Sequence, residues 1–475
     1  MLASVALAGA MFSACAVAPP PSIAGELEVE VPTSWSSASA QTEEDTAALS
    51  SEWWRAFGDE RLDALISLGL SNNPDLRASI ARFEAAAAAH AIAGAPLMPA
   101  VDASFNADRT QRLFLGFPFG GANGAPSANF TQYGLSLGVR WELDVWGRLR
   151  SADAAALADQ QAAVHDLRGA QLSLTAQICR AWFTAIEARQ QLELAEATAA
   201  AFEQTLADVR DRFRRGLRPA LEVHQAANNL AAAHANIAQR TDLLQRAGRQ
   251  LDTLVGRYPA GDFTFTEALP AIIPEVPAGL PSQLLQRRPD LRAAERRVAA
   301  AGCRVDAAEA ALYPKIALTA SGGTQSLDLE GLTDDDLRVW GIGTNLLQPL
   351  FQGGALRAEV KRQEAARAQA LANYSATVLR AFNEVEDILA AENHLKQQLS
   401  ALEESASHAA RARDLARERW AMGLTDFLTV ADGQRQAFQA ESTRLTIARQ
   451  RVDNRIDLLL ALGGGFANES DSEVR

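Results

Sequence analysis

The sequence contains few of the residues that catalytic and metal-binding proteins concentrate. Its 475 residues include three cysteines, six histidines and four methionines. Cys15, Cys179 and Cys303 have no metal-ligand spacing, and a framework of paired cysteines would require an even number. The histidines form no H-E-x-x-H motif, and so few methionines indicate no soft copper or silver site. We therefore expect no enzyme activity, no bound metal and no cofactor.

Positive charge and long apolar runs are also scarce. The net charge is −13, which argues against nucleic acid as a partner. Beyond the N-terminal segment, no apolar run reaches the roughly 18 residues that a membrane-spanning helix requires. Hydrophobic residues make up 48% of the chain but aromatic residues only 6%. This alanine-rich composition favours long, closely approaching helices over a bulky globular core.

The N-terminal stretch M-L-A-S-V-A-L-A-G-A-M-F-S-A-C carries no charged side chain. An apolar segment that ends in small residues is typical of a secretory signal, and this one is too short for a transmembrane helix. Its last four residues, F-S-A-C, resemble a bacterial lipobox, in which cleavage precedes a lipid-modified cysteine. The sequence therefore predicts acylation of Cys15. The alternative is an ordinary signal peptide with an incidental cysteine.

The segment P-D-L-R-A occurs twice, starting at Pro74 and at Pro289. The similarity continues at an offset of 215 residues to Pro99 and Pro314, and then at an offset of 207 residues for the rest of each copy. The change of offset falls in a Gly- and Pro-rich stretch, which predicts a surface loop. Each copy is about 185 residues long, far beyond the period of a solenoid.

The duplication sets the predicted domain organisation. A Pro-rich segment joins the two copies, and a Pro/Ser/Ala-rich segment precedes them. The predicted segments are a signal peptide over 1–14, an extended N-terminal acylated segment over 15–62, the first repeat over 63–256, a Pro-rich linker over 257–282, the second repeat over 283–463 and a flexible tail over 464–475.

Each repeat is predicted to begin with a helix and two strands. The first helix has high helix propensity from Asp75 to about His90. Strict alternation of apolar and polar residues follows and is typical of strands with one apolar face. The positions of the mainly apolar face, which include one threonine, are Val101, Ala103, Phe105 and Ala107; Tyr133, Leu135, Leu137, Val139 and Trp141; Ile316, Leu318 and Ala320; and Trp340, Ile342, Thr344 and Leu346.

A very long helix is predicted over 149–215, with a counterpart in the second repeat. Apolar residues recur every seven positions along two seams, as in a coiled coil. A helix of ~65 residues is about 100 Å long at 1.5 Å per residue. The two helices end at Gly216-Leu217 and Gly423-Leu424, and a returning helix follows each turn. Glycine is the preferred residue just after a helix C-terminus.

Four strands cannot close a barrel, so the sheet would keep exposed edges. Apolar-out, polar-in alternation at about ten residues per strand is the pattern of a transmembrane β-barrel around water. Closure would require strands from other copies of the chain. Two copies supply eight strands and three supply twelve, and only the larger barrel leaves much lumen. The alternative, the edge of a soluble sandwich, leaves the lipobox and the long helices unexplained.

Several motifs resemble those of TolC-like outer-membrane efflux proteins. They are W-W-R-A-F-G-D-E-R-L-D-A-L-I (53–66), W-E-L-D-V-W-G-R-L-R (141–150) and L-L-Q-R-R-P-D-L-R-A-A-E (284–295). The leader C-A-V-A-P-P-P resembles the acylated start of the NodT-like lipoprotein subgroup. This resemblance implies a mainly helical protein with β-strands. It further implies a homotrimer that closes a 12-stranded outer-membrane barrel and a 12-helix periplasmic coiled-coil tunnel.

The resemblance also implies a function and partners. It predicts a lipid-anchored outer-membrane exit duct of a tripartite efflux system. The duct would passively export small molecules that an inner-membrane pump delivers through a periplasmic adaptor protein. The alternatives are a coiled-coil adhesin or secretion scaffold, a type I protein-secretion duct, and a periplasmic enzyme.

In this family the helix turns form the periplasmic tip and contact the adaptor. Acidic residues just after the turns close the tip, and they match Glu222 and Asp432. A threonine, Thr429, occupies the other acidic position of the second repeat, and Asp426, nearer the turn, could compensate. Three-fold rings of carboxylates favour cations; the alternative is that these acids are solvated surface charges. The positions matching the adaptor-contact turns are Gly216, Leu217, Gly423 and Leu424.

Overall fold

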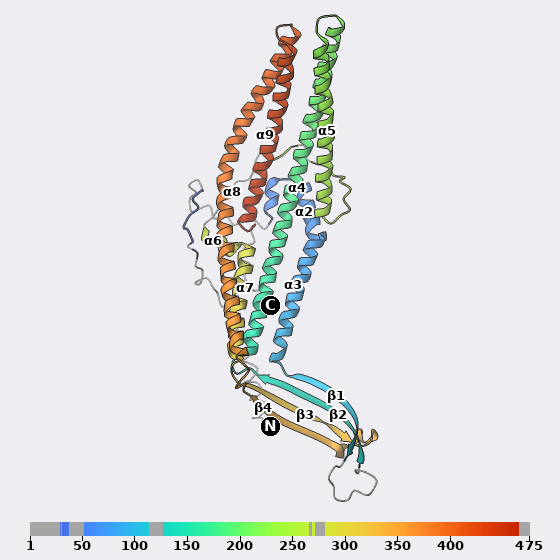
Figure 1. Ribbon diagram of the computed structural model, residues 1–475, viewed down its shortest axis with the longest axis vertical. Helices are drawn as coiled ribbons and strands as arrows, with labels where there is room; N and C mark the ends of the chain where they lie inside the picture. Colours follow the sequence, from blue (N-terminus) through green and yellow to red (C-terminus); the bar gives the residue numbers. More distant parts are fainter. Residues whose placement is uncertain are drawn as a thin grey trace. The chain divides into compact units, whose positions relative to one another are not determined.

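The computed structural model describes residues 29, 31–37, 52–113, 127–265, 268–270 and 281–464 (Figure 1). They form two compact units, and each unit draws on both halves of the sequence. The first unit holds the described residues within 83–163 and 294–374, including the sheet. The second holds those within 28–82, 164–293 and 375–475 and is helical. The predicted signal peptide, Cys15 and nearly all of the predicted tail lie outside the described residues.

The sheet consists of four antiparallel strands in the order β1-β2-β3-β4. Val139 lies opposite both Val101 and Ala320, and Ala320 lies opposite Ile342. Since side chains alternate between faces along a strand, this register places every predicted apolar position on one face. The predicted alternation is confirmed. The strands are β1 (Ala100–Leu113), β2 (Ser127–Leu143), β3 (Lys315–Ser326) and β4 (Arg338–Leu347).

The long helices have the same lengths in both repeats. The pair α4 (Arg148–Arg214) and α8 (Ala355–Ala421) have 67 residues each. The returning helices α5 (Ala220–Leu254) and α9 (Phe427–Ala461) have 35 residues each. Both pairs of boundaries are related by the offset of 207 residues found in the sequence. The predicted pair of long helices with returning partners is therefore confirmed.

The shorter elements also follow the repeat. Helices α3 and α7 begin at the prolines of the two P-D-L-R-A segments, where the missing N–H of proline is tolerated and its φ suits a helix. The bounds are η2 (Trp53–Phe57), α2 (Glu60–Asn72), α3 (Pro74–Gly94), η3 (Ala95–Leu97), α6 (Pro281–Arg287), α7 (Pro289–Ala310), η4 (Glu330–Thr333) and η5 (Asp335–Leu337).

The residue before each of these prolines joins two helices of the second unit. Asn73 Nδ2 donates a hydrogen bond to the carbonyl oxygen of Leu254, the last residue of α5, at 2.8 Å. At the equivalent position of the other repeat, Arg288 Nη1 donates to the carbonyl oxygen of Ala461, the last residue of α9, at 3.3 Å. Helix ends leave carbonyl groups without intrahelical partners. The duplicated motif therefore marks a joint that caps each returning helix.

Small residues allow the helices to approach closely. In the first unit, Ala154 and Ala155 of α4 pack with Cys303 of α7. In the second unit, Cys179 is fully buried, and burial raises the pKa of its thiol. Both cysteines are free and buried, as expected for small core residues. Among the described helices, none has a stretch that is both long and apolar enough to cross a membrane.

Candidate functional site: the hairpin turns and the groove beside them

The four predicted turn residues lie where α4 and α8 end. Gly216 has a φ of 71°, and its N–H donates to the Phe213 carbonyl at 2.9 Å. The N–H of Leu217 donates to the Arg212 carbonyl, also at 2.9 Å. This pair of bonds is the Schellman motif, and the turn at Gly423 repeats it. A Cβ added at either glycine would meet no atom within 4 Å, so the positive φ alone requires glycine.

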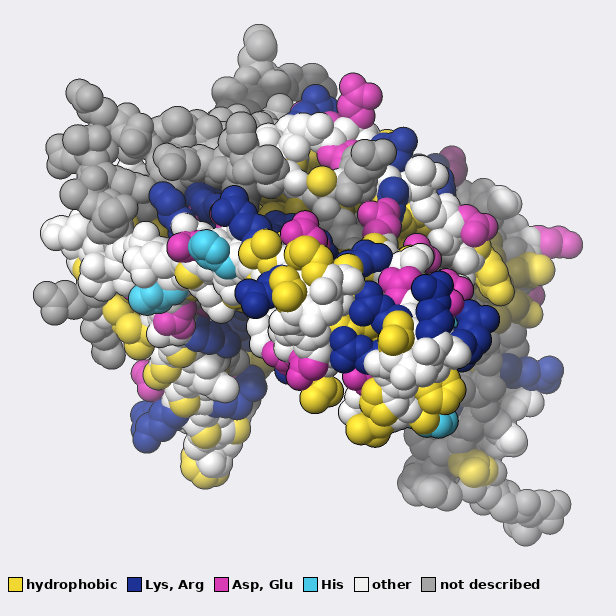
Figure 2. All heavy atoms as spheres, turned by 90° about the horizontal axis from the view of Figure 1, so that it is seen from above, with side chains coloured by type: hydrophobic (Ala, Val, Ile, Leu, Met, Phe, Trp, Pro, Cys, Tyr) yellow, Lys and Arg dark blue, Asp and Glu magenta, His cyan; other side chains and the backbone are white. Residues whose placement is uncertain are grey.

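Each turn presents a leucine to solvent. Leu217 is 67% exposed and Leu424 is 64% exposed. In the view from above, hydrophobic, basic and acidic side chains are intermingled (Figure 2). Exposed apolar side chains that lie among charged ones suit contact with another protein.

Arg212 connects the two hairpins near their turns, and sequence reasoning did not identify it. From α4, its two terminal nitrogens donate to the carbonyl oxygens of Trp420 and Ala421, at 3.0 and 3.1 Å. Its guanidinium carbon lies 4.0 Å from the centroid of the Trp420 ring, a cation–π contact. Arg212 thereby caps α8 from the other repeat. Arg419 occupies the equivalent position of the other repeat, and the sequence does not show which of the two arginines makes this contact.

An apolar cluster lies between the same hairpins. It combines Leu206 and Val209 of α4 with Trp420 of α8 and Phe427 of α9. Burying side chains of this size stabilises the contact by roughly 1.5–3 kcal/mol each. The two hairpins are therefore packed together at this end within one chain.

Two of the predicted gate acids have different surroundings. Glu222, in the first turn of α5, has a side chain 14% exposed and lies 3.6 Å from a nitrogen of Arg218. Its Oε2 is buried and finds no hydrogen-bond partner among the described residues. Asp432 on α9 is exposed, pairs with Arg435 at 2.6 Å and accepts a hydrogen bond from Gln436 at 2.6 Å. Of these two acids, Asp432 is the more exposed to solvent.

Asp426 is the N-cap of α9. Its carboxylate accepts hydrogen bonds from the hydroxyl and the N–H of Thr429, at 2.6 and 2.9 Å. The side-chain bond from Thr429 is the largest cause of the lowered pKa of Asp426, and Arg218 makes a smaller contribution. The threonine at the other acidic position is thus the capping partner of Asp426. An aspartate directly before a helix is a signal that the sequence did offer.

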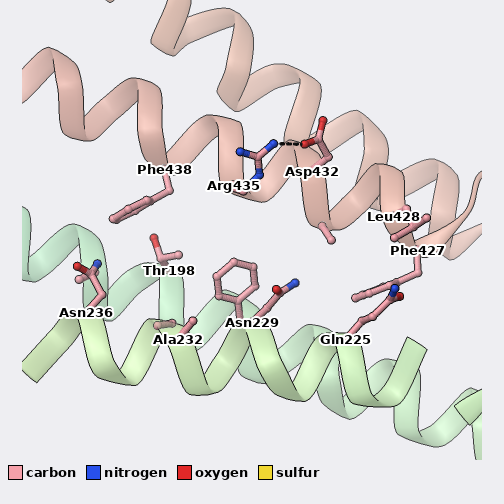
Figure 3. A pocket seen from close by; sticks show the side chains of 14 residues that line it. Thr198, Gln225, Asn229, Ala232, Asn236, Phe427, Leu428, Asp432, Arg435 and Phe438 are labelled. Carbon is pink, nitrogen blue, oxygen red and sulfur yellow. Dashed lines mark hydrogen bonds and ion pairs between the residues drawn. The ribbon is translucent and has the colours of Figure 1, made fainter. Parts of the chain in front are cut away.

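A groove lies beside Asp432, between α5 and α9 and above α4 (Figure 3). Its volume is about 610 Å³. Figure 3 shows Gln225, Asn229 and Asn236 on α5, facing Phe427 and Phe438 on α9. The second unit therefore places a pocket of small-molecule size next to a predicted gate residue.

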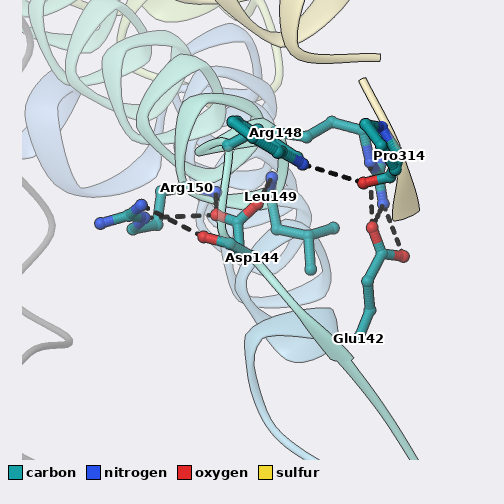
Figure 4. A network of polar contacts seen from close by, with 7 residues as sticks. Glu142, Asp144, Arg148, Leu149, Arg150 and Pro314 are labelled. Carbon is teal, nitrogen blue, oxygen red and sulfur yellow. Dashed lines mark hydrogen bonds and ion pairs between the residues drawn. The ribbon is translucent and has the colours of Figure 1, made fainter. Parts of the chain in front are cut away.

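The motif W-E-L-D-V-W-G-R-L-R forms the junction from β2 to α4 in the first unit (Figure 4). Both oxygens of Glu142 pair with Arg148 Nη2, at 2.8 and 2.9 Å. Asp144 accepts the N–H groups of Leu149 and Arg150 at 2.9 and 2.8 Å, so it satisfies free donors at the start of α4. This motif fixes the exit of a strand into a helix.

Trp146 completes that junction. Its indole N–H donates to the Pro314 carbonyl at 2.9 Å, and its ring stacks on Tyr313 at a centroid distance of 4.9 Å. The second repeat has P-L-F-Q-G-G-A-L-R over 349–357 and so lacks the Glu–Arg pair. Within the part of the chain that the structure describes, no group of three or more His, Cys, Asp or Glu side chains could hold a metal ion.

Comparisons with known proteins agree with this architecture. A family model described as outer membrane efflux protein matches residues 65–257 and 280–464. The chain is 33% identical over 439 residues to the outer membrane protein OprJ of Pseudomonas aeruginosa, covering 92% of this chain and 90% of OprJ. The chain therefore belongs to the outer membrane efflux protein family.

Solved structures show the same fold. The outer-membrane channel OprN superposes with a TM-score of 0.85 at 28% identity, covering 94% of this chain and 99% of that one. The CmeC outer membrane channel of Campylobacter jejuni has a TM-score of 0.88 at 22% identity, covering 97% of each chain, and supports the fold alone. The chain is mainly helical with β-strands, as in TolC-like channels.

These findings confirm the principal interpretation of the sequence. The protein is an outer-membrane efflux protein rather than a secretion scaffold, and it is located in the outer membrane. Its family is one of transport channels rather than of enzymes.

Proposed function

We propose that three copies of this chain form the exit duct of a tripartite efflux system. The duct passively carries small molecules, which an inner-membrane pump delivers through a periplasmic adaptor. The sheet carries this proposal. Among the described residues, β1 and β4 each pair on one side only, and an unpaired edge is a template for another strand. Strands of neighbouring copies would close twelve strands into a barrel.

The exposed apolar face of the sheet supports a membrane location. Trp340 is 81% exposed and Ile342 is 80% exposed, both on the face that also holds Phe105. The opposite face pairs Asp102 with Arg140 at 3.2 Å. An apolar face toward lipid and a charged face toward water suit a barrel around an aqueous lumen.

We further propose that the periplasmic tip carries the gate and the adaptor contact. Asp432, Glu222 and Asp426 would form acidic rings in the trimer, with Asp432 and Asp426 exposed to solvent and the side chain of Glu222 largely buried. The exposed Leu217 and Leu424, held by Gly216 and Gly423, would meet the adaptor. The acids follow these turns within a few residues in the sequence, which supports placing the gate and the adaptor contact in the same region.

Planar-bilayer recording of the purified protein tests the duct. We expect stepwise conductance with a preference for cations over anions, and Asp432→Asn should reduce that preference. Glu441→Gln is the matched control, because Glu441 pairs with Arg444 at 2.6 Å with the same spacing. It lies nine positions along α9, about 180° around the helix. A protein that never conducts would refute the duct, and equal effects of both variants would refute the gate.

We also propose that Cys15 carries the lipid anchor. The position lies outside the described residues, and the lipobox-like F-S-A-C supports it. Cys15→Ser should abolish palmitate labelling of the protein in cells. Persistent labelling of that variant would contradict acylation at Cys15.

A further inference from the structure

The groove beside Asp432 has the dimensions of a binding site for a small molecule. Its volume of about 610 Å³ falls within the range of about 300–1,000 Å³ that is typical of ligand pockets. Alanines such as Ala195, Ala232 and Ala233 line it, and their small side chains leave room between the helices. The groove is therefore formed by the packed faces of the helices and not by a chain end.

Aromatic side chains supply the apolar lining. Phe202 comes from α4, and Phe427 and Phe438 come from α9. Phe427 is 1% exposed and belongs to the apolar cluster that joins the hairpins, so its position is fixed by packing. Figure 3 shows Phe427 and Phe438 projecting from α9 toward α5. Aromatic rings favour stacked or edge-on contact with another planar ring.

Three carboxamides on α5 supply hydrogen-bonding groups. Gln225, Asn229 and Asn236 are spaced by four and seven residues, which places them on one face of the helix. All three are half-buried, and none forms a hydrogen bond with another described residue. A carboxamide offers both a donor and an acceptor. The groove thus presents a row of such groups opposite the phenylalanines.

The groove carries no net charge. The charged residues that line it are Asp432 and Arg435, and they pair with each other at 2.6 Å. A charged molecule would lose its hydration on entering the groove and would find no unpaired opposite charge there. A neutral molecule escapes that cost.

We propose that this groove binds neutral, planar aromatic molecules that carry hydrogen-bonding groups. This inference rests on the proposed function, because it names a class of cargo for the same duct. Phe202 and Phe438, which are partly exposed, contact the ring, and Phe427 supports the groove wall from the apolar cluster. Gln225, Asn229 and Asn236 bond the polar groups of the molecule. The site lies beside Asp432, so bound cargo would occupy the wall next to the gate.

Fluorescence anisotropy with two matched probes tests the proposal on the purified full-length protein in nanodiscs. The neutral probe is 7-amino-4-methylcoumarin, and its anionic analogue is 7-amino-4-methylcoumarin-3-acetic acid. We expect saturable binding of the neutral probe and binding of the anion at least about tenfold weaker. Absence of saturable binding, or equal binding of both probes, would overturn the proposal.

Two neighbouring alanines provide the matched variants. Both are exposed, but Ala232 lines the groove and Ala231 lies outside its lining. Ala232→Trp should weaken binding of the neutral probe at least about tenfold by filling the groove, and Ala231→Trp should change it less than about twofold. Asn229→Leu, similar in size, should also weaken binding because it removes one hydrogen-bonding group. Unchanged binding in both groove variants would refute the site.

A second copy of the chain is the competing occupant of the groove. If Ala232→Trp dissociates the oligomer during size-exclusion chromatography while Ala231→Trp does not, the groove is an interface between copies, and the proposal is wrong. Bilayer recording distinguishes failure of the proposed binding site from failure of the proposed duct. A protein that conducts but binds no probe refutes the cargo site alone, and one that binds the probe but never conducts refutes the duct.

Discussion

Asp453 on α9 has a partly buried carboxyl group, and its effect on the free energy of unfolding can be measured. Its side chain is 21% exposed and forms an ion pair with Arg449. Its Oδ1 has no hydrogen-bond partner among the described residues. The pKa of Asp453 is raised from 3.8 to about 6, and burial of the carboxyl group is the largest cause. Within that net shift, Arg449 and Arg180 of α4 oppose the effect of burial, and Asp457 adds to it.

The sign and size of the effect follow from this shift. Between pH ~4 and ~6 the folded chain binds a proton at Asp453 that the unfolded chain has released. The contribution of protonated Asp453 to the free energy of unfolding is therefore fully present below pH 3.8 and is lost as the pH rises through about 6. A shift of about two pKa units corresponds to about 3 kcal/mol. Asp453→Asn, which is neutral at every pH, should retain this stability at pH 7.

Denaturant unfolding followed by helical circular dichroism, at pH values from 4 to 8, measures the difference. The free energy of unfolding of Asp453→Asn should exceed that of the wild type by about 3 kcal/mol per chain at pH 7 and converge with it near pH 4. Asp242→Asn, which removes the exposed partner of Arg246 on α5, serves as control and should give no such gain. Parallel pH profiles for Asp453→Asn and the wild type would refute the reasoning.

Two further predictions concern the hairpin turns. Gly216→Ala should lower the free energy of unfolding by about 1 kcal/mol, because its φ is 71° and no atom obstructs a Cβ. Gly169→Ala in α4 is the control and should be neutral or stabilising by up to about 1 kcal/mol, since its Cβ would make an ordinary 3.7 Å contact; equal losses would contradict the argument from φ. Arg212→Met should accelerate amide hydrogen exchange in the last turn of α8 about tenfold, as two hydrogen bonds and the contact with Trp420 are lost. Arg419→Met, at the equivalent position of the other repeat, should leave that exchange unchanged, and identical rates in both variants would show that Arg212 does not hold the turn.

The elements that depend on local periodicity could be predicted from the sequence. Alternation over Tyr133 to Trp141 identified β2, because a period of two leaves one face apolar whatever that face contacts. Gly216 and Gly423 marked the ends of the long helices, because a positive φ is a local requirement. The repeat offset of 207 residues then carried the boundaries of one half over to the other.

Contacts between distant helices could not be predicted in this way. Arg212 binds carbonyl groups about 208 residues away, and nothing in its neighbours distinguishes it from Arg419. The groove likewise needs Phe202, Asn229 and Phe438 from three helices at once. Asp426 was treated as a gate acid because of its distance from the turn, while its bonds with Thr429 make it a helix cap. Its role in gating stays a prediction.

The equal lengths of the two hairpins limit how this protein can change in evolution. One residue inserted into α4 within the second unit would move everything beyond it by about 1.5 Å and turn it by about 100°. Arg212 would then no longer reach the carbonyl groups of Trp420 and Ala421, and Val209 would leave the cluster that it shares with Phe427. An insertion of seven residues would nearly restore the angle, but only a matching insertion in α8 would restore the height. Helices α4 and α8 should therefore change length together, in matched steps of about two helical turns. A relative in which only one of them is longer would need different contacts between the hairpins near their turns.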